Sequence, residues 1–381
     1  MQIKKQTKGK AYKKAKKLGS KEVIKLLKNK AVVGQGGANF PTGTKWEMVL
    51  NEKEPEKYII CNADEGEPGT FKDKFILTNN PDIVIEGLLI GAEVIKAKKA
   101  FIYLRGEYEY LLPKIKRSIT KVKKQTKSKI PIEIVVGQGA YICGEETAIM
   151  ESIANRRPQP LQKPPFPTQN GLYGKPTVLN NVGTLANVSL AIHYKDFDPE
   201  LRLYSLSGNL TTPGIFELKL GIKLGDLIRL GNPEHPIKAV YFGCFGGCMP
   251  YNPDMKISPK DICGKDCILG SCTIIAVDEK HSIVDMATNI AKFYEFESCG
   301  KCTPCREGTM RILGLLENIS MKDASMKDLD TLQELAEVIK ETSFCGLGQT
   351  ATSHLLTALK HFRKEFEERV KEKRNRRRVA R

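Results

Sequence analysis

Short apolar runs alternate with longer amphipathic stretches between residues 31 and 200. The short runs, bounded by polar, glycine or proline residues, predict buried strands at 58–61, 101–104 and 130–136. Stretches with apolar residues at helical spacing predict helices at 20–30, 44–50, 81–97, 110–124 and 145–155. Strands that alternate with helices indicate an α/β layer with a mainly parallel sheet.

The pattern changes after residue 203. Three short strands and one helix are expected there, with the helix at 224–230 and the strands at 203–208, 214–218 and 239–242. The chain then has helical spacing from 282 to 370, interrupted by cysteines. We therefore expect five parts: a basic segment 1–30, an α/β domain 31–200, a small β domain 201–280, a helical domain 281–370 and a basic tail 371–381.

The net charge of +17 is concentrated at the two ends of the chain. Residues 1–30 hold twelve lysines and one glutamate, and residues 371–381 hold seven basic residues and one glutamate. The body between them is neutral, which argues against a nucleic-acid-binding domain. We expect the two ends to be solvated, partly disordered segments, and the alternative is contact with an acidic partner, anionic lipid or RNA.

No stretch of the sequence is long and apolar enough to cross a membrane. The best one, 83–95, is short and contains Glu86 and Glu93. The lysine-rich start lacks the apolar segment of a secretory signal. These features predict a cytoplasmic protein without a transmembrane segment, with docking on the inner face of a membrane as the alternative.

Eleven cysteines in a cytosolic chain indicate metal or redox chemistry. Cys299, Cys302 and Cys305 form a C-x2-C-x2-C triplet, and Cys345 is the cysteine that follows it. This spacing favours a [4Fe–4S] cluster bound by these four thiolates, because zinc sites usually combine two separate C-x2-C pairs. Five further cysteines suggest a second metal site or buried apolar groups, and they are Cys244, Cys248, Cys263, Cys267 and Cys272.

A loop with four glycines precedes the helix predicted at 44–50. Glycine lets backbone N–H groups approach a phosphate closely. The loop lacks the G-x-G-x-x-G order of a dinucleotide-binding strand–turn–helix, so alone it is equally consistent with a structural turn. The loop residues that we consider candidates for ligand contact are Gly34, Gly36, Gly37, Phe40, Gly43 and, just beyond it, Lys45.

Polar side chains follow the predicted strands at three places. They cluster at 62–67, at 141–146 and at the pair Asn180 and Asn181. Ligands gather at the carboxyl ends of parallel strands, where amides suit a flavin edge and carboxylates suit ribose hydroxyls. Helix capping explains one residue at each place but not the accumulation of acids.

These motifs, in this order, resemble the FMN- and NADH-binding subunit of respiratory complex I, which NAD-linked hydrogenases and formate dehydrogenases share. The resemblance covers about 31–370. It implies a Rossmann-like α/β flavin domain, a ubiquitin-like β-grasp domain and a C-terminal helical bundle that holds the cluster. It assigns the flavin and nucleotide contacts to the glycine loop and Lys45 and to Asn62, Asp64, Glu65, Glu67, Tyr141, Gly144, Glu145, Glu146, Asn180 and Asn181.

The resemblance also implies a mechanism and partners. NADH gives a hydride to FMN, and electrons leave singly through the cluster, so no side chain need act as acid or base. The expected partners are a thioredoxin-like [2Fe–2S] subunit and a larger Fe–S subunit of the same complex, and no nucleic acid is expected. The rivals are the same fold in a soluble hydrogenase or formate dehydrogenase complex, a scaffold that has lost NADH binding, and a cluster-bearing nucleic-acid-binding protein.

The chain departs from the family pattern at four positions. Gln35 stands where the family usually has arginine, and Gly183 stands where it has an acidic residue. Asn39 replaces a usual loop glycine, and Met48 replaces a frequent aromatic residue. These changes bear on nucleotide affinity more than on flavin binding.

Overall fold

The structure is a computed structural model that describes residues 1–263 and 266–379, with the side chains of residues 263 and 371–379 outside the description. The chain forms two compact units. The first contains residues 1–66 and 71–203, and the second contains residues 67–70 and the chain from 204 onward. Among the described residues, no helix has the length and apolar character needed to span a membrane.

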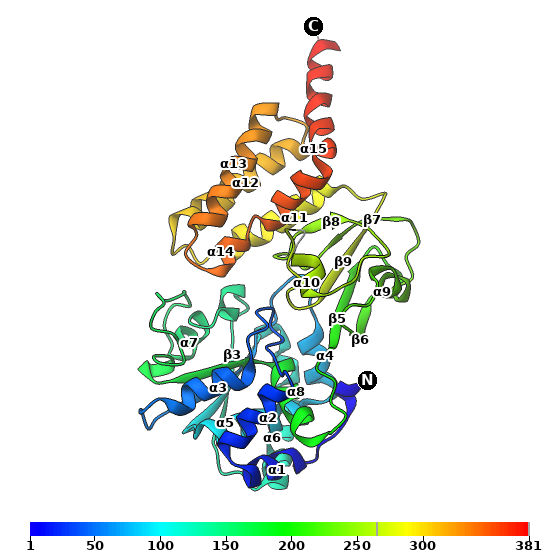
Figure 1. The fold of residues 1–381 in the computed structure, drawn as a ribbon. Coiled ribbons are helices and arrows are strands. Elements are labelled where there is room, and N and C mark those ends of the chain that lie inside the picture. Colours follow the sequence, from blue (N-terminus) through cyan, green and yellow to red (C-terminus); the bar gives the residue numbers. More distant parts are fainter. Residues whose placement is uncertain (264–265, 380–381) are drawn as a thin grey trace. The chain divides into compact units, whose positions relative to one another are not determined.

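A four-stranded parallel sheet is the centre of the first unit (Figure 1). Its strand order is β3-β2-β1-β4. The strands are β1 (Tyr58–Ala63), β2 (Lys99–Leu104), β3 (Ile132–Val136) and β4 (Thr177–Asn181). All neighbouring pairs are parallel. The α/β class with a parallel sheet is therefore confirmed, and β4 is a strand that the sequence pattern did not indicate.

Alternation along β1 places its side chains in two separate cores. Ile59 and Cys61 join the large core formed with helices α5 (Pro81–Ile95) and α8 (Val182–His193). Tyr58 and Ile60 join a smaller core on the opposite face, together with residues of α7 (Ala148–Ile153). Because both faces are covered, β1 is buried except at the half-buried Asn62, as a central parallel strand should be.

The basic segment 1–30 is folded, so the expectation of a solvated, partly disordered start is wrong. It contains the short 3-10 helix η1 (Gln2–Lys4) and the helices α1 (Lys10–Leu18) and α2 (Ser20–Asn29). Ala11 and Tyr12 are at most 2% exposed and belong to the large core. Lysines on the outer positions and apolar residues on the inner positions allow one highly charged segment to pack against the body.

The remaining helices of the first unit surround these layers. They are α3 (Thr42–Asn51), α4 (Lys72–Asn79) and α6 (Leu112–Thr126), with short 3-10 turns η2 (Gly106–Leu111), η3 (Tyr141–Gly144) and η4 (Leu172–Gly174). Helix α6 packs on α5 through its buried Ile115 and Val122. The basic helix predicted at 110–124 therefore exists, shifted by two residues.

The second unit contains a five-stranded mixed sheet in the order β6-β5-β9-β7-β8. The strands are β5 (Leu201–Gly208), β6 (Gly214–Lys219), β7 (Ile237–Tyr241), β8 (Cys248–Pro250) and β9 (Thr273–Asp278). β5 and β9 are parallel, and β7 is antiparallel to β8 and β9. Helix α9 (Leu224–Leu230) contributes Leu224 and Leu227 to the core of this sheet. The unit also includes the short α10 (Pro259–Cys263).

Helices form the rest of the second unit (Figure 1). They are α11 (Ile283–Glu297), α12 (Thr303–Ser320), α13 (Met326–Thr342), the short α14 (Gly346–Thr350) and α15 (Ser353–Val379). α11, α12, α13 and α15 contact one another in that order, and α15 returns to α11. Their buried residues, such as Leu316, Leu332 and Leu355, recur at helical spacing, as the sequence pattern predicts.

Candidate functional sites

The asparagines predicted for the flavin site meet at the carboxyl ends of β1 and β4. In the parallel register, Cys61 is paired with Asn180 and Asn62 with Asn181. The chain reaches β4 after a connection that passes from β3 to the far side of β1. A change of direction of this kind in an open parallel sheet leaves a crevice at the strand ends where ligands bind.

Asn180 is held by the single tryptophan of the chain. The indole Nε1–H of Trp46 donates a hydrogen bond of 2.8 Å to the Asn180 side-chain oxygen, and both residues are buried. This bond fixes the amide orientation, because the oxygen is used by the indole. The Asn180 amide N–H2 group is thereby left as the donor end of the side chain.

Asn181 connects the strand end to a buried charged pair on α4. Its Nδ2 donates to Asp73 at 2.6 Å, and Lys72 Nζ donates to Asp73 at 2.8 Å. The Asn181 oxygen accepts from the backbone N–H of Gly183 at 2.9 Å, so this residue is the N-cap of α8. The sequence placed both asparagines at the start of a helix, and in the structure they end β4 and Asn181 caps the helix.

The glycine-rich loop closes on itself and lies against the start of α8. Gly34 N–H donates to the Phe40 carbonyl at 2.9 Å, and Gln35 N–H donates to the Thr184 hydroxyl at 2.8 Å. A Cβ at Gly36 would lie 3.4 Å from the Asn181 Cβ. Gly37 has φ of 108°, which disfavours any other residue. Backbone N–H groups, asparagine amides and small residues therefore meet at one place, which is the donor set that a phosphate-bearing flavin requires.

Close packing between α2 and α3 explains why residue 43 is glycine. A Cβ there would lie 2.9 Å from the Ile24 carbonyl oxygen and 2.9 Å from Lys28 Cγ, both on α2. The residue is buried in the first turn of α3. Its presence in the loop motif is thus explained by the contact between α2 and α3.

Two lysines and two glutamates form a charged group beside this loop. Lys163 Nζ donates to Glu145 at 2.8 Å and to Glu146 at 2.7 Å, and Lys45 Nζ lies 3.9 Å from Glu146. Lys45 Nζ also lies 5.6 Å from the centroid of the Phe40 ring, which is 41% exposed. Burial lowers the pKa of Lys45, and the carboxylate of Glu146 opposes that shift.

The two glutamates differ in what holds them. Glu145 Oε2 accepts from the backbone N–H groups of Thr147 at 2.8 Å and Ala148 at 2.9 Å, at the start of α7. Burial raises the pKa of Glu145, but the hydrogen bonds from Lys163, Thr147 and Ala148 outweigh burial and lower it. Glu145 is therefore a helix cap as well as a candidate ligand contact, whereas Glu146 binds the two lysines.

The Glu65 carboxylate is buried, and groups of the protein itself donate hydrogen bonds to it. Its carboxylate accepts from the backbone N–H groups of Asp73 at 2.8 Å and Lys74 at 3.0 Å, and from the Tyr108 hydroxyl at 3.1 Å. Burial, followed by the nearby Asp73 carboxylate, raises the pKa of Glu65. Its neighbour Asp64 is also buried, with its Oδ1 4.0 Å from the Arg105 guanidinium. Glu65 thus supports α4 beneath the Asp73–Asn181 contact.

Glu67 belongs to the second unit. Its carboxylate accepts from the Ser271 hydroxyl at 2.9 Å, the Thr70 hydroxyl at 3.0 Å and the Cys244 backbone N–H at 3.1 Å. A Cβ at Gly243 would lie 1.9 Å from the Glu67 carboxylate, so only glycine fits there. The resemblance placed Glu67 in a nucleotide cavity, and in the structure its carboxylate joins the segment 67–70 to the mixed sheet.

Tyr141 and Gly144 delimit η3, which lies across the end of β1. Asn62 Nδ2 donates to the Gly144 carbonyl at 3.1 Å. A Cβ at Gly66 would lie 2.9 Å from Tyr141 Cδ2. Three of the predicted groups, residues 62–66, residues 141–146 and the asparagine pair, are therefore contiguous in the first unit.

The four cysteines predicted as cluster ligands gather at one end of the helices in the second unit. Cys302 is the N-cap of α12, Cys305 lies in its first turn and Cys345 is the N-cap of α14. Burial, and then the neighbouring thiols of Cys302, Cys345 and Cys299, raise the pKa of Cys305 to about 11, against a hydrogen bond from Ser298. Three of the four thiols lie at helix N-termini, which suits an anionic cluster because helix dipoles stabilise negative charge there.

Two contacts bring Cys345 to the triplet. A Cβ at Gly348 would lie 3.2 Å from the Cys305 Cβ, so α14 packs directly on the first turn of α12. Lys301 Nζ lies 4.4 Å from the centroid of the Phe344 ring, which joins the two cysteine loops. Arg306 donates to the Gly300 carbonyl at 2.7 Å and fixes the turn between Cys299 and Cys302.

The described cysteines do not form the suggested second metal site. Among described residues, no three Cys, His, Asp or Glu side chains are placed to hold one metal ion, and this includes the four predicted cluster ligands. Cys244, Cys248, Cys267 and Cys272 are all buried, and burial strongly raises the pKa of the Cys244 and Cys248 thiols. The fifth member, Cys263, has a side chain that lies outside the described residues. Small buried apolar groups are the better description of these four.

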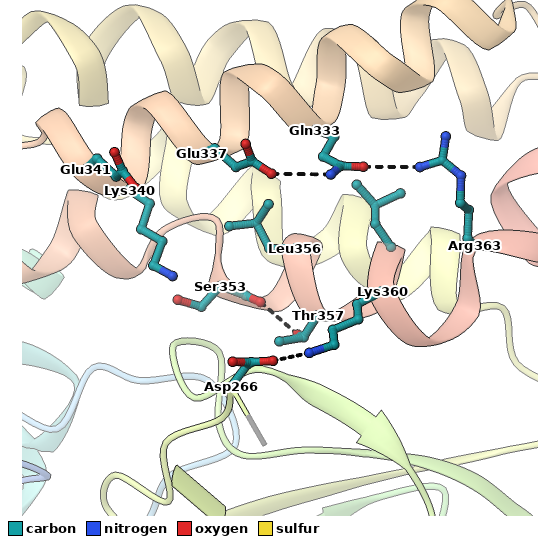
Figure 2. Close-up of a pocket in the computed structure, with 11 residues that line it drawn as sticks. Asp266, Gln333, Glu337, Lys340, Glu341, Ser353, Leu356, Thr357, Lys360 and Arg363 are labelled. Atoms are coloured by element: carbon teal, nitrogen blue, oxygen red, sulfur yellow. Dashed lines mark hydrogen bonds and ion pairs between the residues drawn. The ribbon is translucent and has the colours of Figure 1, made fainter. Parts of the chain in front are cut away.

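A cavity of about 500 Å³ lies between α13 and α15 in the second unit (Figure 2). Two of its charged side chains form ion pairs: Lys360 with Asp266, and Arg363 with Asp330 at 3.0 Å. None of the residues predicted to bind a cofactor lines it. The lining residues are Asp266, Gln333, Glu337, Lys340, Glu341, Ser353, Leu356, Thr357, Leu359, Lys360 and Arg363.

The structure adds residues that were absent from the sequence-based set. Trp46, Lys72 and Asp73 position the two asparagines, and Lys163 bridges the two glutamates. Trp46 could have been singled out from the sequence, because it is the single tryptophan and is adjacent to Lys45. Lys163 lies in a proline-rich stretch with no internal pattern, so the sequence offered no physical reason to single it out.

Comparisons with known proteins support the two cofactors, FMN and a [4Fe–4S] cluster. Residues 27–190 match the family model of the Nuo51 FMN-binding domain, and residues 285–369 match that of the NADH-ubiquinone oxidoreductase-F iron-sulfur binding region. The chain is 40% identical to an F subunit of the NADH-quinone oxidoreductase of Rhizobium meliloti, over 93% of this chain and 90% of that protein. It is 39% identical to the F subunit of the NADH-quinone oxidoreductase of Aquifex aeolicus, over 94% of this chain and 88% of that protein.

Hydrogenase subunits are also similar. The chain is 35% identical to HndC, a subunit of the NADP-reducing hydrogenase of Solidesulfovibrio fructosivorans, over 92% of this chain and 76% of that protein. Its fold is similar to a chain of an NAD+-reducing [NiFe]-hydrogenase in the H2-reduced state, with a TM-score of 0.88 and 33% identity. That match covers 94% of this chain but 64% of the hydrogenase chain. The chain therefore belongs to the family of NADH-quinone oxidoreductase F subunits, flavin oxidoreductase subunits with an FMN-binding domain and a [4Fe–4S] binding region.

Proposed function

We propose that this chain oxidises NADH at an FMN held at the β1–β4 crevice and delivers the electrons, through a [4Fe–4S] cluster bound by Cys299, Cys302, Cys305 and Cys345, to a partner Fe–S subunit. The observation that carries the proposal is the meeting of the glycine-rich loop with Asn62, Asn180 and Asn181. FMN, when bound, supplies the chemistry that accepts an electron pair and releases electrons singly.

The residues of the first unit would bind and orient the flavin. The loop backbone N–H groups and the α8 N-terminus would face its phosphate. The Asn180 amide N–H2 group, whose orientation Trp46 fixes, would donate to a flavin oxygen. Asp73 and Lys72 would act as positioning residues through Asn181 and not by touching the cofactor.

Lys45, Phe40 and the two glutamates would hold the nucleotide. The half-exposed Phe40 ring offers a flat apolar surface, and the Lys45 ammonium lies beside it. Glu146 carries its charge at the rim of the site, where a carboxylate can accept from ribose hydroxyls. Tyr141 and Gly144 would shape the space above Asn62.

The second unit would carry electrons away. Its mixed sheet with α9 is proposed to be the β-grasp domain of the family, and its helices to be the bundle that holds the cluster. Two aromatic residues beside the cysteines are exposed, Phe296 by 82% and Phe344 by 36%. Exposed aromatic residues at a redox site suit contact with another protein, and we infer that a thioredoxin-like [2Fe–2S] subunit or a larger Fe–S subunit docks there. The complex would be cytoplasmic or peripheral on the inner face of the membrane.

Cofactor analysis of anaerobically purified protein tests the proposal. We expect one FMN and about four irons for each chain, and reduction of ferricyanide by NADH. Cys302→Ala and Cys345→Ala should each abolish the low-temperature electron paramagnetic resonance signal of the cluster and leave FMN in place. Cys272→Ala, at a buried cysteine outside the set, should keep all four irons.

Three results would count against parts of this assignment. Protein that stays flavin-free after reconstitution would exclude the flavin site. Retention of the cluster in Cys345→Ala would remove that cysteine from the ligand set. Flavin-loaded protein that NADH does not bleach would leave a scaffold that has lost the nucleotide site.

The second candidate is the same reaction inside a hydrogenase complex. The similarity to HndC and to the [NiFe]-hydrogenase chain favours it. Affinity purification of the native complex, followed by identification of the co-purifying subunits, separates the two. A quinone-reducing assembly should bring membrane subunits, and a hydrogenase complex should bring a hydrogenase catalytic subunit.

A further inference from the structure

Arg105 is a largely buried cation at the carboxyl ends of the parallel strands, and the roles assigned above do not include it. It directly follows β2, and its backbone N–H donates to the carbonyl of Ala63, the last residue of β1, at 3.1 Å. Its side chain is only 14% exposed. Arginine is seldom buried to this extent unless it is paired, so the contacts of the guanidinium indicate what it does.

One end of the guanidinium forms a surface ion pair. Arg105 Nη2 donates to the carboxylate of Glu107, whose side chain is 53% exposed. An ion pair of this kind contributes little to stability, because solvent screens the charges. It therefore does not explain why the rest of the arginine side chain is buried.

The other end of the guanidinium, Nη1, lies beside the turn at 62–66. It is 4.0 Å from Asp64 Oδ1, and the Asp64 side chain is 1% exposed. A Cβ at Gly66 would clash with Nη1 and would lie 2.9 Å from Tyr141 Cδ2, so the guanidinium occupies space that a side chain at position 66 would need. Nη1 is buried and forms no hydrogen bond with any residue that the structure describes.

Asp64 connects this cation to the predicted flavin contacts. Its backbone N–H donates to the Asn62 side-chain oxygen at 3.0 Å, and Asn62 Nδ2 donates to the Gly144 carbonyl at 3.1 Å. A carboxylate with so little exposure is costly unless a cation compensates its charge. The Arg105 guanidinium supplies that compensation directly behind the turn.

We propose that Arg105 is a positioning residue for the flavin, which compensates the charge of Asp64 and thereby favours the reduced cofactor. This inference rests on the proposed function. Flavin gains negative charge when it takes up two electrons at neutral pH, so an uncompensated carboxylate beside it would disfavour the reduced form. With the guanidinium in place, Asp64 can contact the flavin without opposing that charge. Arg105 therefore acts through Asp64 and not by touching the cofactor.

Spectroelectrochemical titration of the FMN-loaded, full-length protein tests this inference. The midpoint potential of the flavin reports its affinity in the reduced form relative to the oxidised form. Arg105→Gln should lower that ratio by about tenfold, which corresponds to about 30 mV for a two-electron couple. Arg105→Lys keeps a positive charge and should retain most of the wild-type ratio. A merely structural role would weaken the binding of both forms alike, which fluorescence titration with oxidised FMN detects.

Further variants test whether the effect passes through Asp64. Asp64→Asn/Arg105→Gln removes both charges and should return the ratio to near the wild-type value. Glu107→Gln, at the exposed partner of the same guanidinium, is the matched control and should keep the wild-type ratio. Circular dichroism verifies folding. Asp64→Asn, which leaves the guanidinium uncompensated, should raise the ratio, and it replaces Arg105→Gln in the comparison if that variant does not fold.

The outcomes separate this inference from the proposed function. An unchanged ratio in flavin-loaded Arg105→Gln, or an equal fall in Glu107→Gln, would overturn the inference and leave the proposed function standing. A double variant with a ratio as low as that of Arg105→Gln would also overturn it, because the guanidinium would then act on the flavin without Asp64. Wild-type protein that binds no FMN after reconstitution would overturn the proposed function, and this inference with it.

Discussion

Gln35 and Gly183 are in direct contact beside the proposed flavin crevice: a Cβ on Gly183 would lie 3.2 Å from the Gln35 Cβ. These are two of the positions at which the chain departs from the family pattern, where arginine and an acidic residue are usual. Because the two sites are adjacent, the chain has lost a basic and an acidic residue together. The local net charge is thereby the same as in the family pattern.

This adjacency predicts coupling between the two positions. Gln35→Arg alone places a cation near the α8 N-terminus, where the helix dipole disfavours it, and Gly183→Asp alone adds an anion in the first turn of α8, where the dipole favours it. The double variant should be more stable than the sum of the single effects by about 0.5–1 kcal/mol. A double-mutant cycle of unfolding free energies measures the coupling, and additivity would show that the side chains do not meet.

The Trp46–Asn180 hydrogen bond predicts a link between stability and flavin binding. Asn180→Ala leaves a buried indole N–H without its acceptor, which should destabilise the protein by about 1–3 kcal/mol, and it removes an amide from the site. Trp46→Phe removes the donor and leaves the amide free to rotate. We expect both variants to bind FMN more weakly, measured by flavin fluorescence on titration. Unchanged affinity in Trp46→Phe would mean that the indole does not orient the amide.

The neighbouring glutamates should respond differently to substitution. Glu145→Ala removes the acceptor for two N–H groups at the start of α7 and should lower the unfolding free energy by about 1 kcal/mol. Glu146→Ala caps no helix, so its effect on stability should be small.

For nucleotide preference we expect the opposite ranking, with substitution of Glu146 having the larger effect. Wild type should prefer NADH, because a carboxylate at the rim repels a 2′-phosphate. Glu146→Gln should raise kcat/KM for NADPH relative to NADH by about tenfold, since Lys45 and Lys163 would then face the phosphate with less competition. An unchanged ratio would exclude Glu146 from nucleotide discrimination.

Glu86 predicts that the basic start of the chain contributes to stability. This buried carboxylate on α5 accepts from the backbone N–H groups of Gly9 and Tyr12, both at 2.9 Å, and from the Thr7 hydroxyl. Glu86→Ala should destabilise the first unit by about 1–3 kcal/mol, because these donors lose their acceptor. Glu93→Ala, at a partly exposed carboxylate that binds the Tyr12 hydroxyl, should have a smaller effect. Equal thermal shifts in the two variants would contradict this ranking.

The contrast between residues 1–18 and the parallel sheet shows which features could be predicted from the sequence. Strands β1 to β3 follow from local apolar runs between polar residues, so their positions were predicted to within two residues. The folding of 1–18 depends on Glu86, which lies far along the chain, and composition indicated only lysine-rich character. Strand β4 was not predicted because it ends in two asparagines, so it lacks the continuous apolar run that indicated the other strands.

The candidate sites show the same limit. Cysteine spacing predicted the triplet and Cys345 because the chemistry requires those residues at those separations. The roles of the charged residues around the proposed flavin crevice were harder to predict from the sequence. Glu65 and Glu67 look equivalent in sequence, yet Glu65 caps α4 in the first unit and Glu67 is bound to Ser271 in the second. Only the long-range contacts, which no local pattern encodes, separate their roles.

His354 predicts how the stability of the second unit depends on pH. The side chain is fully buried, its ring is stacked on Tyr294 at 6.1 Å, and its Nε2 lies 3.2 Å from the Ala287 carbonyl oxygen. Burial lowers its pKa from 6.5 to about 4, because the charged imidazolium is poorly solvated there. Between these values the unfolded chain binds a proton that the folded chain does not. The contribution of His354 to the free energy of unfolding is therefore fully present above about pH 6.5 and is lost as the pH falls toward about 4.

The test compares wild type with His354→Phe, which keeps a ring against Tyr294 but cannot titrate. The unfolding free energy of wild type, relative to the variant, should decrease by at most about 3 kcal/mol between about pH 7 and about pH 4. Urea unfolding followed by circular dichroism measures it at each pH. His235→Asn, at a half-buried histidine outside the helices, is the control variant and should track the wild type across the range. A constant difference between wild type and His354→Phe would mean that the buried imidazole keeps its ordinary affinity for protons, which its enclosure by the helices argues against.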